Sequence, residues 1–111
     1  MMNDHITQFF DLSKKINTEI ITFTRCLLLV LMAYSIDGLQ YRELKAILNI
    51  SDGKLKSNLN KLSDMNYIRK SEVELDQKKL DIYELTDDGK REFDKILGWM
   101  KLILNMVNNE C

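Results

Sequence analysis

The chain has 111 residues, of which 45% are hydrophobic and 30% are charged, and its formal net charge is −1 at pH 7. This length fits one domain, and the hydrophobic fraction excludes an intrinsically disordered chain. The two cysteines, Cys26 and Cys111, form no closely spaced pair, so a zinc site is not expected. Their usage fits a reducing, cytoplasmic compartment, although a redox role for Cys111 stays open.

Neither a membrane span nor a signal peptide is expected. The most apolar stretch, residues 20–36, is interrupted by Arg25 and is shorter than the ~20 apolar residues that a span needs. The first residues include Asp4 and His5 in place of a basic segment. His5 is the only histidine, and its place near a terminus argues against a ligand or catalytic role.

The first part of the chain is predicted to be helical. Apolar residues recur at helical spacing over residues 4–16, which predicts a short N-terminal helix. Asn17 or Thr18 is a suitable cap for a second helix. That helix is expected to run to about Ser35 and to end at the turn residues Asp37 and Gly38.

Two short amphipathic helices and a tight turn follow. The first is predicted over Tyr41–Leu48, and Asn49 with Ile50 makes the turn. Ser51 is a good cap for the second helix, which ends near Met65. That second helix has one narrow apolar stripe, made by Leu55, Leu59 and Leu62. Two such helices around a tight turn are typical of a helix-turn-helix.

A β-hairpin is predicted directly after the second helix. Its strands are Tyr67–Leu75 and Leu80–Leu85, and its polar tip is Asp76–Lys79. Thr86 is then expected to cap a last helix over Asp87–Val107. The predicted fold is therefore mainly α with a small β-hairpin wing, a winged helix-turn-helix with extra N- and C-terminal helices.

The last helix has a wide apolar face. One seam follows a 4-3-4-3 spacing, and Ile96, Trp99, Ile103 and Met106 form a second seam beside it. Because a small domain cannot cover so wide a face alone, a second copy of the chain is the expected partner. The predicted dimer-interface residues are Phe93, Leu97, Met100, Ile103, Leu104 and Val107.

The segment from Tyr41 to Gly89 resembles the winged-helix transcriptional regulators of the MarR/ArsR-like superfamily, in a small single-domain branch. The motifs are the turn Ser-Asp-Gly-Lys-Leu at residues 51–55 and the ending Tyr-Glu-Leu-Thr-Asp-Asp-Gly at residues 83–89. The resemblance covers roughly residues 25–93. It implies that residues 51–64 form the recognition helix, that Lys78 and Lys79 form the wing tip, and that the protein is a homodimeric repressor on pseudo-palindromic operators.

The chain departs from this family in two ways. Its wing is short and carries acidic residues, Glu72, Glu74 and Asp76, which argues against insertion into the minor groove. It also lacks the clustered cysteines and histidines of metal-sensing members, so no metal response and no cofactor are expected.

The expected DNA-binding side chains come from the helix-turn-helix and the wing. Residues 40–79 contain nine basic and six acidic side chains, a local excess of positive charge. Polar residues opposite or beside the leucine stripe fit the major groove, where lysine reads guanine and asparagine reads adenine. Basic residues on the preceding helix and the wing fit phosphates. The predicted set is Arg42, Lys45, Ser51, Lys54, Ser57, Asn58, Lys61, Lys78 and Lys79.

The sequence thus predicts a sequence-specific regulator of transcription that binds double-stranded DNA as a homodimeric repressor. The alternative is a winged-helix module that binds proteins and not specific DNA. No enzyme is expected, because Asp87 and Asp88 are explained as partners of a helix dipole. Residues 1–111 are expected to form one domain, with an N-terminal extension (1–18), a winged-helix core (19–85) and a dimerisation helix (86–108). A small-molecule pocket between the terminal helices stays open.

Overall fold

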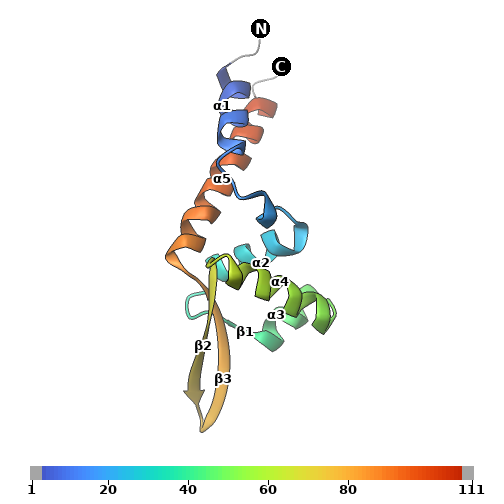
Figure 1. The fold of residues 1–111 in the computed structure, drawn as a ribbon, viewed down its shortest axis with the longest axis vertical. Helices are drawn as coiled ribbons and strands as arrows, with labels where there is room; N and C mark the ends of the chain where they lie inside the picture. Colours follow the sequence, from blue (N-terminus) through green and yellow to red (C-terminus); the bar gives the residue numbers. More distant parts are fainter. Residues whose placement is uncertain (1–3, 109–111) are drawn as a thin grey trace.

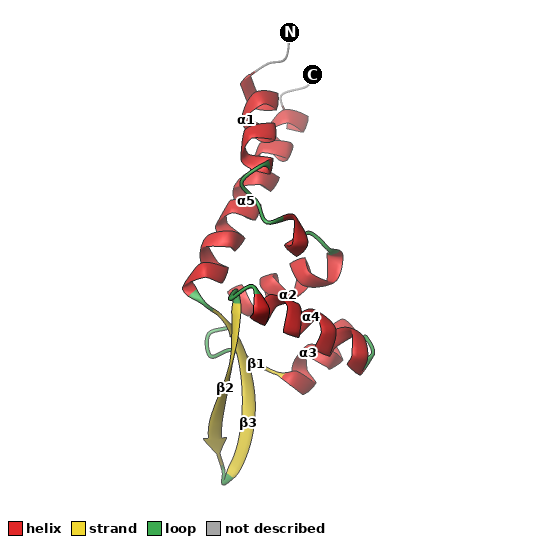
Figure 2. Cartoon of the chain, in the orientation of Figure 1, coloured by secondary structure: helices red, strands yellow, loops and turns green. Residues whose placement is uncertain are grey.

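A computed structural model describes residues 4–108 as a long helical arm joined to a winged-helix unit (Figure 1). The chain measures 63 × 25 × 24 Å along its principal axes, and the arm and the wing lie at opposite ends (Figure 2). The elements are α1 (Asp4–Ser13), the 3₁₀ helix η1 (Thr18–Ile20), α2 (Phe23–Ala33), β1 (Leu39–Gln40), α3 (Tyr41–Leu48), α4 (Asp52–Asp64), β2 (Ile68–Leu75), β3 (Lys78–Leu85) and α5 (Asp87–Asn108). Cys111, for which a redox role was left open, lies outside the described residues.

The two helices of the helix-turn-helix are confirmed. Asn49 ends α3 in the left-handed conformation with φ 53°, which an asparagine adopts more readily than most residues. Ser51 then caps α4, because its hydroxyl oxygen accepts the N–H of Lys54 at 3.2 Å. These two local devices set the tight turn between α3 and α4.

The prediction of one continuous helix from residue 17 or 18 to about Ser35 is wrong. Asn17 caps the short η1, since its side chain accepts the N–H of Glu19 at 3.0 Å. Thr22 then adopts an extended backbone and caps α2 through the N–H of Arg25 at 3.2 Å. Two capping residues five positions apart therefore break the apolar run into a turn of 3₁₀ helix and a shorter α-helix.

The wing is a hairpin with a tighter tip than expected. Asp76 and Gln77 both have positive φ, 53° and 66°, which is the backbone of a two-residue hairpin turn. Lys78 and Lys79 were predicted at this tip, but they are the first residues of β3 and pair with β2. The short strand β1, which was not predicted, joins the other edge of β3 and gives the order β1-β3-β2.

The core lies where α2 meets the helix-turn-helix and the base of the sheet. Side chains from α2, α3 and α4 are fully buried there, among them Leu28, Leu44, Leu55 and Leu62. Ile68 and Leu85, at the base of the wing, complete the same cluster. The leucine stripe predicted on α4 is therefore its core-facing side.

The arm consists of α1 lying along the distal half of α5 (Figure 1). The Trp99 indole N–H donates to the Ser13 hydroxyl at 2.7 Å, and its ring lies 5.4 Å from the Phe9 ring. A helix of the same chain thus covers the Trp99 side of α5, which reduces the apolar face predicted to need a second chain. Leu104 and Val107 remain exposed on α5.

A buried polar cluster ties the arm to the winged-helix unit. Glu92 on α5 is only 6% exposed, and it accepts the backbone N–H of Asn17 at 3.1 Å and the Tyr67 hydroxyl at 3.4 Å. Lys95 lies 3.5 Å from the same carboxylate. Since this cluster joins η1, the base of the wing and α5, it fixes the start of η1 against the rest of the chain.

Within residues 4–108, no helix has the combined length and hydrophobicity required to cross a bilayer. The same residues also contain no group of three or more histidine, cysteine, aspartate or glutamate side chains arranged to hold a metal ion.

Candidate nucleic-acid interface

The polar face of α4 points away from the protein. Leu55, Leu59 and Leu62 bury one side of this helix against the core. At about 100° per residue, Ser57 and Asp64 lie on the opposite side, and both are exposed. Lys54 and Lys61 lie on one shoulder of this outward face, while Lys56 and Asn60 lie on the other, towards the wing.

An ion pair and a hydrogen bond brace the N-terminus of α4 against α3. The Asp52 carboxylate lies 3.0 Å from the Lys45 ammonium and accepts the Tyr41 hydroxyl at 2.8 Å. The hydrogen bond from Lys45, and to a smaller extent the one from Tyr41, hold the pKa of Asp52 below its usual range. The pKa of Tyr41 is raised to about 12, mainly because its hydroxyl is partly removed from water. The hydrogen bond to Asp52 and the negative charge of Asp52 raise it further. Lys45, a predicted phosphate ligand, therefore already has an anionic partner.

Two other predicted DNA ligands on α4 are held by residues of η1 and α2. Arg25 donates from Nε to the Asn58 side-chain oxygen at 3.0 Å, and the Asn58 amide donates to the Lys54 carbonyl at 2.8 Å. The Lys61 ammonium lies 3.1 Å from the Glu19 carboxylate. Asn58 is thus fixed on the flank that faces α2, where one acceptor site and one N–H of its amide remain for a further partner.

A groove of about 470 Å³ separates α4 from the base of the wing. Its lining joins the starts of α3 and β2, the wing side of α4 and the middle of β3, and consists of Tyr41, Lys56, Asn60, Lys70, Asp81 and Tyr83. Lys56, Asn60 and Lys70 line this groove but were not among the predicted DNA-binding residues. The signal for Lys56 and Asn60 was their helical angle, but Lys70 comes close to them only through the fold of the wing.

The wing carries more acid than base. Residues 68–85 contain four basic and five acidic side chains. Lys79 lies 3.7 Å from Glu72, and Lys70 lies 4.0 Å from Asp81. Within residues 4–108, the cations of the helix-turn-helix and wing without an ion pair are Arg42, Lys54, Lys56 and Lys78. The unpaired cations therefore gather mainly on α3 and α4.

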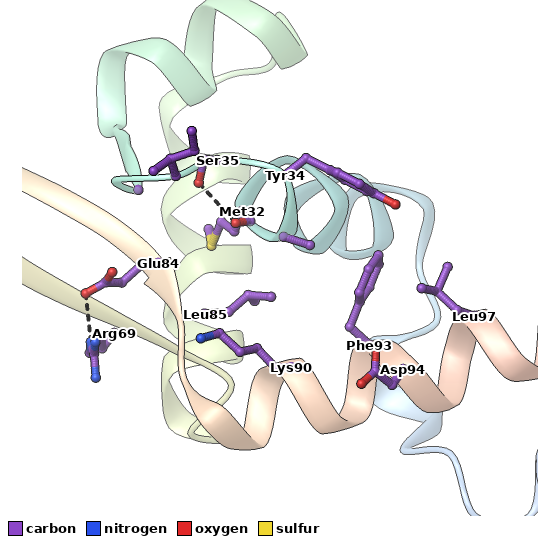
Figure 3. Close-up of a pocket in the computed structure, with 13 residues that line it drawn as sticks. Met32, Tyr34, Ser35, Arg69, Glu84, Leu85, Lys90, Phe93, Asp94 and Leu97 are labelled. Carbon is purple, nitrogen blue, oxygen red and sulfur yellow. Dashed lines mark hydrogen bonds and ion pairs between the residues drawn. The ribbon is translucent and has the colours of Figure 1, made fainter.

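A second concavity, of about 540 Å³, lies between the end of α2, the base of the wing and the start of α5 (Figure 3). Met32, Leu85 and Phe93 are buried residues of its lining. Charged side chains surround them, including Arg69, which pairs with Glu84 at 2.8 Å. This pocket shares no lining residue with the groove beside α4.

The predicted dimer residues are distributed unevenly along α5. Phe93 is only 8% exposed and belongs to the chain's own core, so little of it is left for a partner. Leu97 is partly buried against the same core. Ile103 is half-buried, and Met100, Leu104 and Val107 are exposed on the arm.

Solved structures show the same fold. A mutant MepR from a multidrug-resistant S. aureus isolate matches with a TM-score of 0.74 and 16% identity, over 96% of this chain and 77% of that one. A transcriptional regulator homologue from Pyrococcus horikoshii matches with a TM-score of 0.71 and 14% identity, over 95% and 98% of the two chains. Another S. aureus MepR mutant, bound to an oligodeoxyribonucleotide, has a TM-score of 0.70 and 14% identity, over 100% and 85%.

No curated protein matches the sequence. The family model described as "Winged helix DNA-binding domain" matches residues 25–104, which include most of α2, the helix-turn-helix, the wing and most of α5. The chain therefore belongs to the winged helix DNA-binding domain family.

Proposed function

We propose that this protein is a transcriptional regulator, a repressor, that binds specific double-stranded DNA as a homodimer through α4. The observation that carries the proposal is the exposed polar face of α4, flanked by cations without an ion pair among residues 4–108. An α-helix fits the major groove, which is about 12 Å wide. The similarity in fold to a MepR bound to an oligodeoxyribonucleotide also supports it.

Different side chains have different roles in this proposal. Lys54 and Ser57 face outward and would reach base edges. Arg42 on α3 would contact a phosphate and set the position of the helix on the duplex. Ser51 contributes by capping α4.

A second copy is proposed to cover the exposed apolar side of the arm. Met100, Leu104 and Val107 are exposed hydrophobic residues on one side of α5, and Phe10 on α1 is another exposed hydrophobic residue of the arm. The winged-helix core (19–85) would then bind DNA, while residues 1–18 and 86–108 hold the copies together. Two recognition helices in such a dimer bind half-sites about one helical turn apart.

Fluorescence anisotropy tests DNA binding. The protein is titrated onto a duplex from its own upstream region and onto a scrambled duplex, over a series of salt concentrations. We expect tighter binding to the upstream duplex and steep weakening with salt. Lys54→Ala should cost about 1–3 kcal/mol and reduce the preference between the duplexes. Lys101→Ala, an exposed lysine on α5, is the matched control and should change neither.

Light scattering tests the dimer with a matched pair of variants. Leu104 on the arm and Leu75 on the wing are both 60% exposed. Leu104→Glu should convert the dimer into a monomer at tens of micromolar protein, because each copy would bury an unpaired carboxylate in the interface. Leu75→Glu should remain dimeric. A monomeric wild-type protein at this concentration contradicts the dimer.

An interaction module without specific DNA binding is the second candidate. The acidic wing favours it, and so do Val73 and Leu75, which are exposed hydrophobic residues on one face of the wing. Weak, salt-insensitive binding to both duplexes would favour this candidate over the first.

A further inference from the structure

An acidic side chain from outside the helix-turn-helix forms an ion pair with a lysine of the proposed DNA-binding surface. Glu19 on η1 reaches α4, where its carboxylate lies 3.1 Å from the Lys61 ammonium. Lys61 lies on a shoulder of the outward face, so a phosphate that approaches α4 meets this pair. Lys61 is therefore already paired with an acid of its own chain.

The position of Glu19 is fixed by its neighbours. Its backbone N–H donates to the Asn17 side chain at 3.0 Å, and its carbonyl oxygen accepts a hydrogen bond from the Arg25 guanidinium. Asn17 is in turn held by the buried Glu92, and Ile20, the next residue, is fully buried. Although the ion pair is exposed, η1 cannot move away from α4 without breaking these contacts.

We propose that Glu19 is an intramolecular competitor that restrains the affinity of α4 for DNA by occupying Lys61. This inference rests on the proposed function and adds a residue that sets its strength. DNA gains a phosphate contact at Lys61 only by displacing Glu19. A complex that places no phosphate at this point leaves the pair closed and is unaffected by it, whereas a complex that places a phosphate there is weakened by the cost of opening the pair.

Removal of the competitor has a measurable signature. One additional phosphate contact steepens the dependence of log K on log salt by about 0.9. Exposed ion pairs have equilibrium constants of about 1.4 to 5, so Glu19→Gln should tighten binding by roughly two- to fivefold at low salt. Glutamine keeps the size of the side chain and removes its charge.

The experiment compares four variants with the wild type on a random-sequence duplex, by anisotropy over a salt series, with thermal unfolding as a check of folding. The variants are Glu19→Gln, Lys61→Ala, the double variant and Asp64→Asn. Asp64 is the matched control, since it is an exposed acid on the outward face of α4 without an ion pair among residues 4–108. Asp64→Asn removes one negative charge, as Glu19→Gln does, but it releases no cation from an ion pair.

Competition predicts that Glu19→Gln binds more tightly and with a steeper salt slope, that Lys61→Ala abolishes this gain, and that Asp64→Asn leaves the slope unchanged. If Glu19→Gln also tightens DNA binding in the Lys61→Ala background, its effect is a general reduction of charge repulsion. This result overturns the inference but leaves the proposed function intact. If the wild type binds DNA and Glu19→Gln binds it with the same affinity, the inference is also overturned. If neither protein binds DNA at low salt, the proposed function fails, and the inference fails with it.

Discussion

Replacing Gly89 with alanine should destabilise the protein, although alanine is the better helix former. Gly89 is buried in the first turn of α5, and a Cβ there would lie 2.0 Å from the Tyr67 carbonyl oxygen. That oxygen cannot withdraw easily, because it accepts the backbone N–H of Thr86 at 3.0 Å, and Thr86 caps α5. Overpacking costs about 1–3 kcal/mol, and the helix propensity of alanine returns up to about 1 kcal/mol. We expect a net loss of about 1–2 kcal/mol.

Gly53 is the matched control for this substitution. It also lies in the first turn of a helix, but no atom lies within 4 Å of a Cβ built there. Gly53→Ala should therefore gain up to about 1 kcal/mol. Urea denaturation of both variants, at equal protein concentration, should separate their free energies of unfolding by about 1–3 kcal/mol. A Gly89→Ala protein as stable as the wild type would refute the steric argument.

Two further predictions concern ionisable groups. The folded state raises the pKa of Tyr41 to about 12. The protonated Tyr41 therefore contributes to stability below the ordinary tyrosine pKa of about 10, and this contribution is lost as the pH rises towards 12. A titration followed by absorbance at 295 nm should detect the late ionisation of Tyr41, and Asp52→Asn should shift it towards lower pH. Glu92→Ala should lower the free energy of unfolding by about 1–3 kcal/mol, because it removes a buried acceptor and leaves partly buried donors, including the Tyr67 hydroxyl, without it. Glu72→Ala, at an exposed ion pair, should cost less than about 1 kcal/mol in the same urea titration, and equal losses would contradict the role of burial.

The helix-turn-helix was predictable because its signals are local. The cap at Ser51, the turn at Asn49 and the leucine spacing on α4 each act within a few residues, and each is confirmed. The cap at Thr86 is confirmed for the same reason. Such devices are read from neighbouring residues without knowledge of the fold.

The errors arise where local signals compete or where distant segments meet. Asn17 and Thr22 are both good caps, and the fold uses both, with the fully buried Ile20 between them. The strand β1 has two residues, and it exists because β3 offers it an edge. Gly38, with φ 80° and no room for a Cβ beside Ile82, permits that approach. Neither the break between η1 and α2 nor the strand β1 produces a periodic pattern of hydrophobic residues in the sequence.

The exposed polar face of α4 was predictable from the sequence, but the pairing of the cations around it was not, and the reason is electrostatic. A count of charges over residues 40–79 treats every lysine as available. In the fold, Lys45 has Asp52 as its partner and Lys61 has Glu19, which comes from outside that window. The field that DNA meets therefore depends on which cations are unpaired, and on how easily a phosphate displaces the others. Since Glu19 and Lys61 are far apart in sequence, charge patterning along the chain cannot reveal this ion pair.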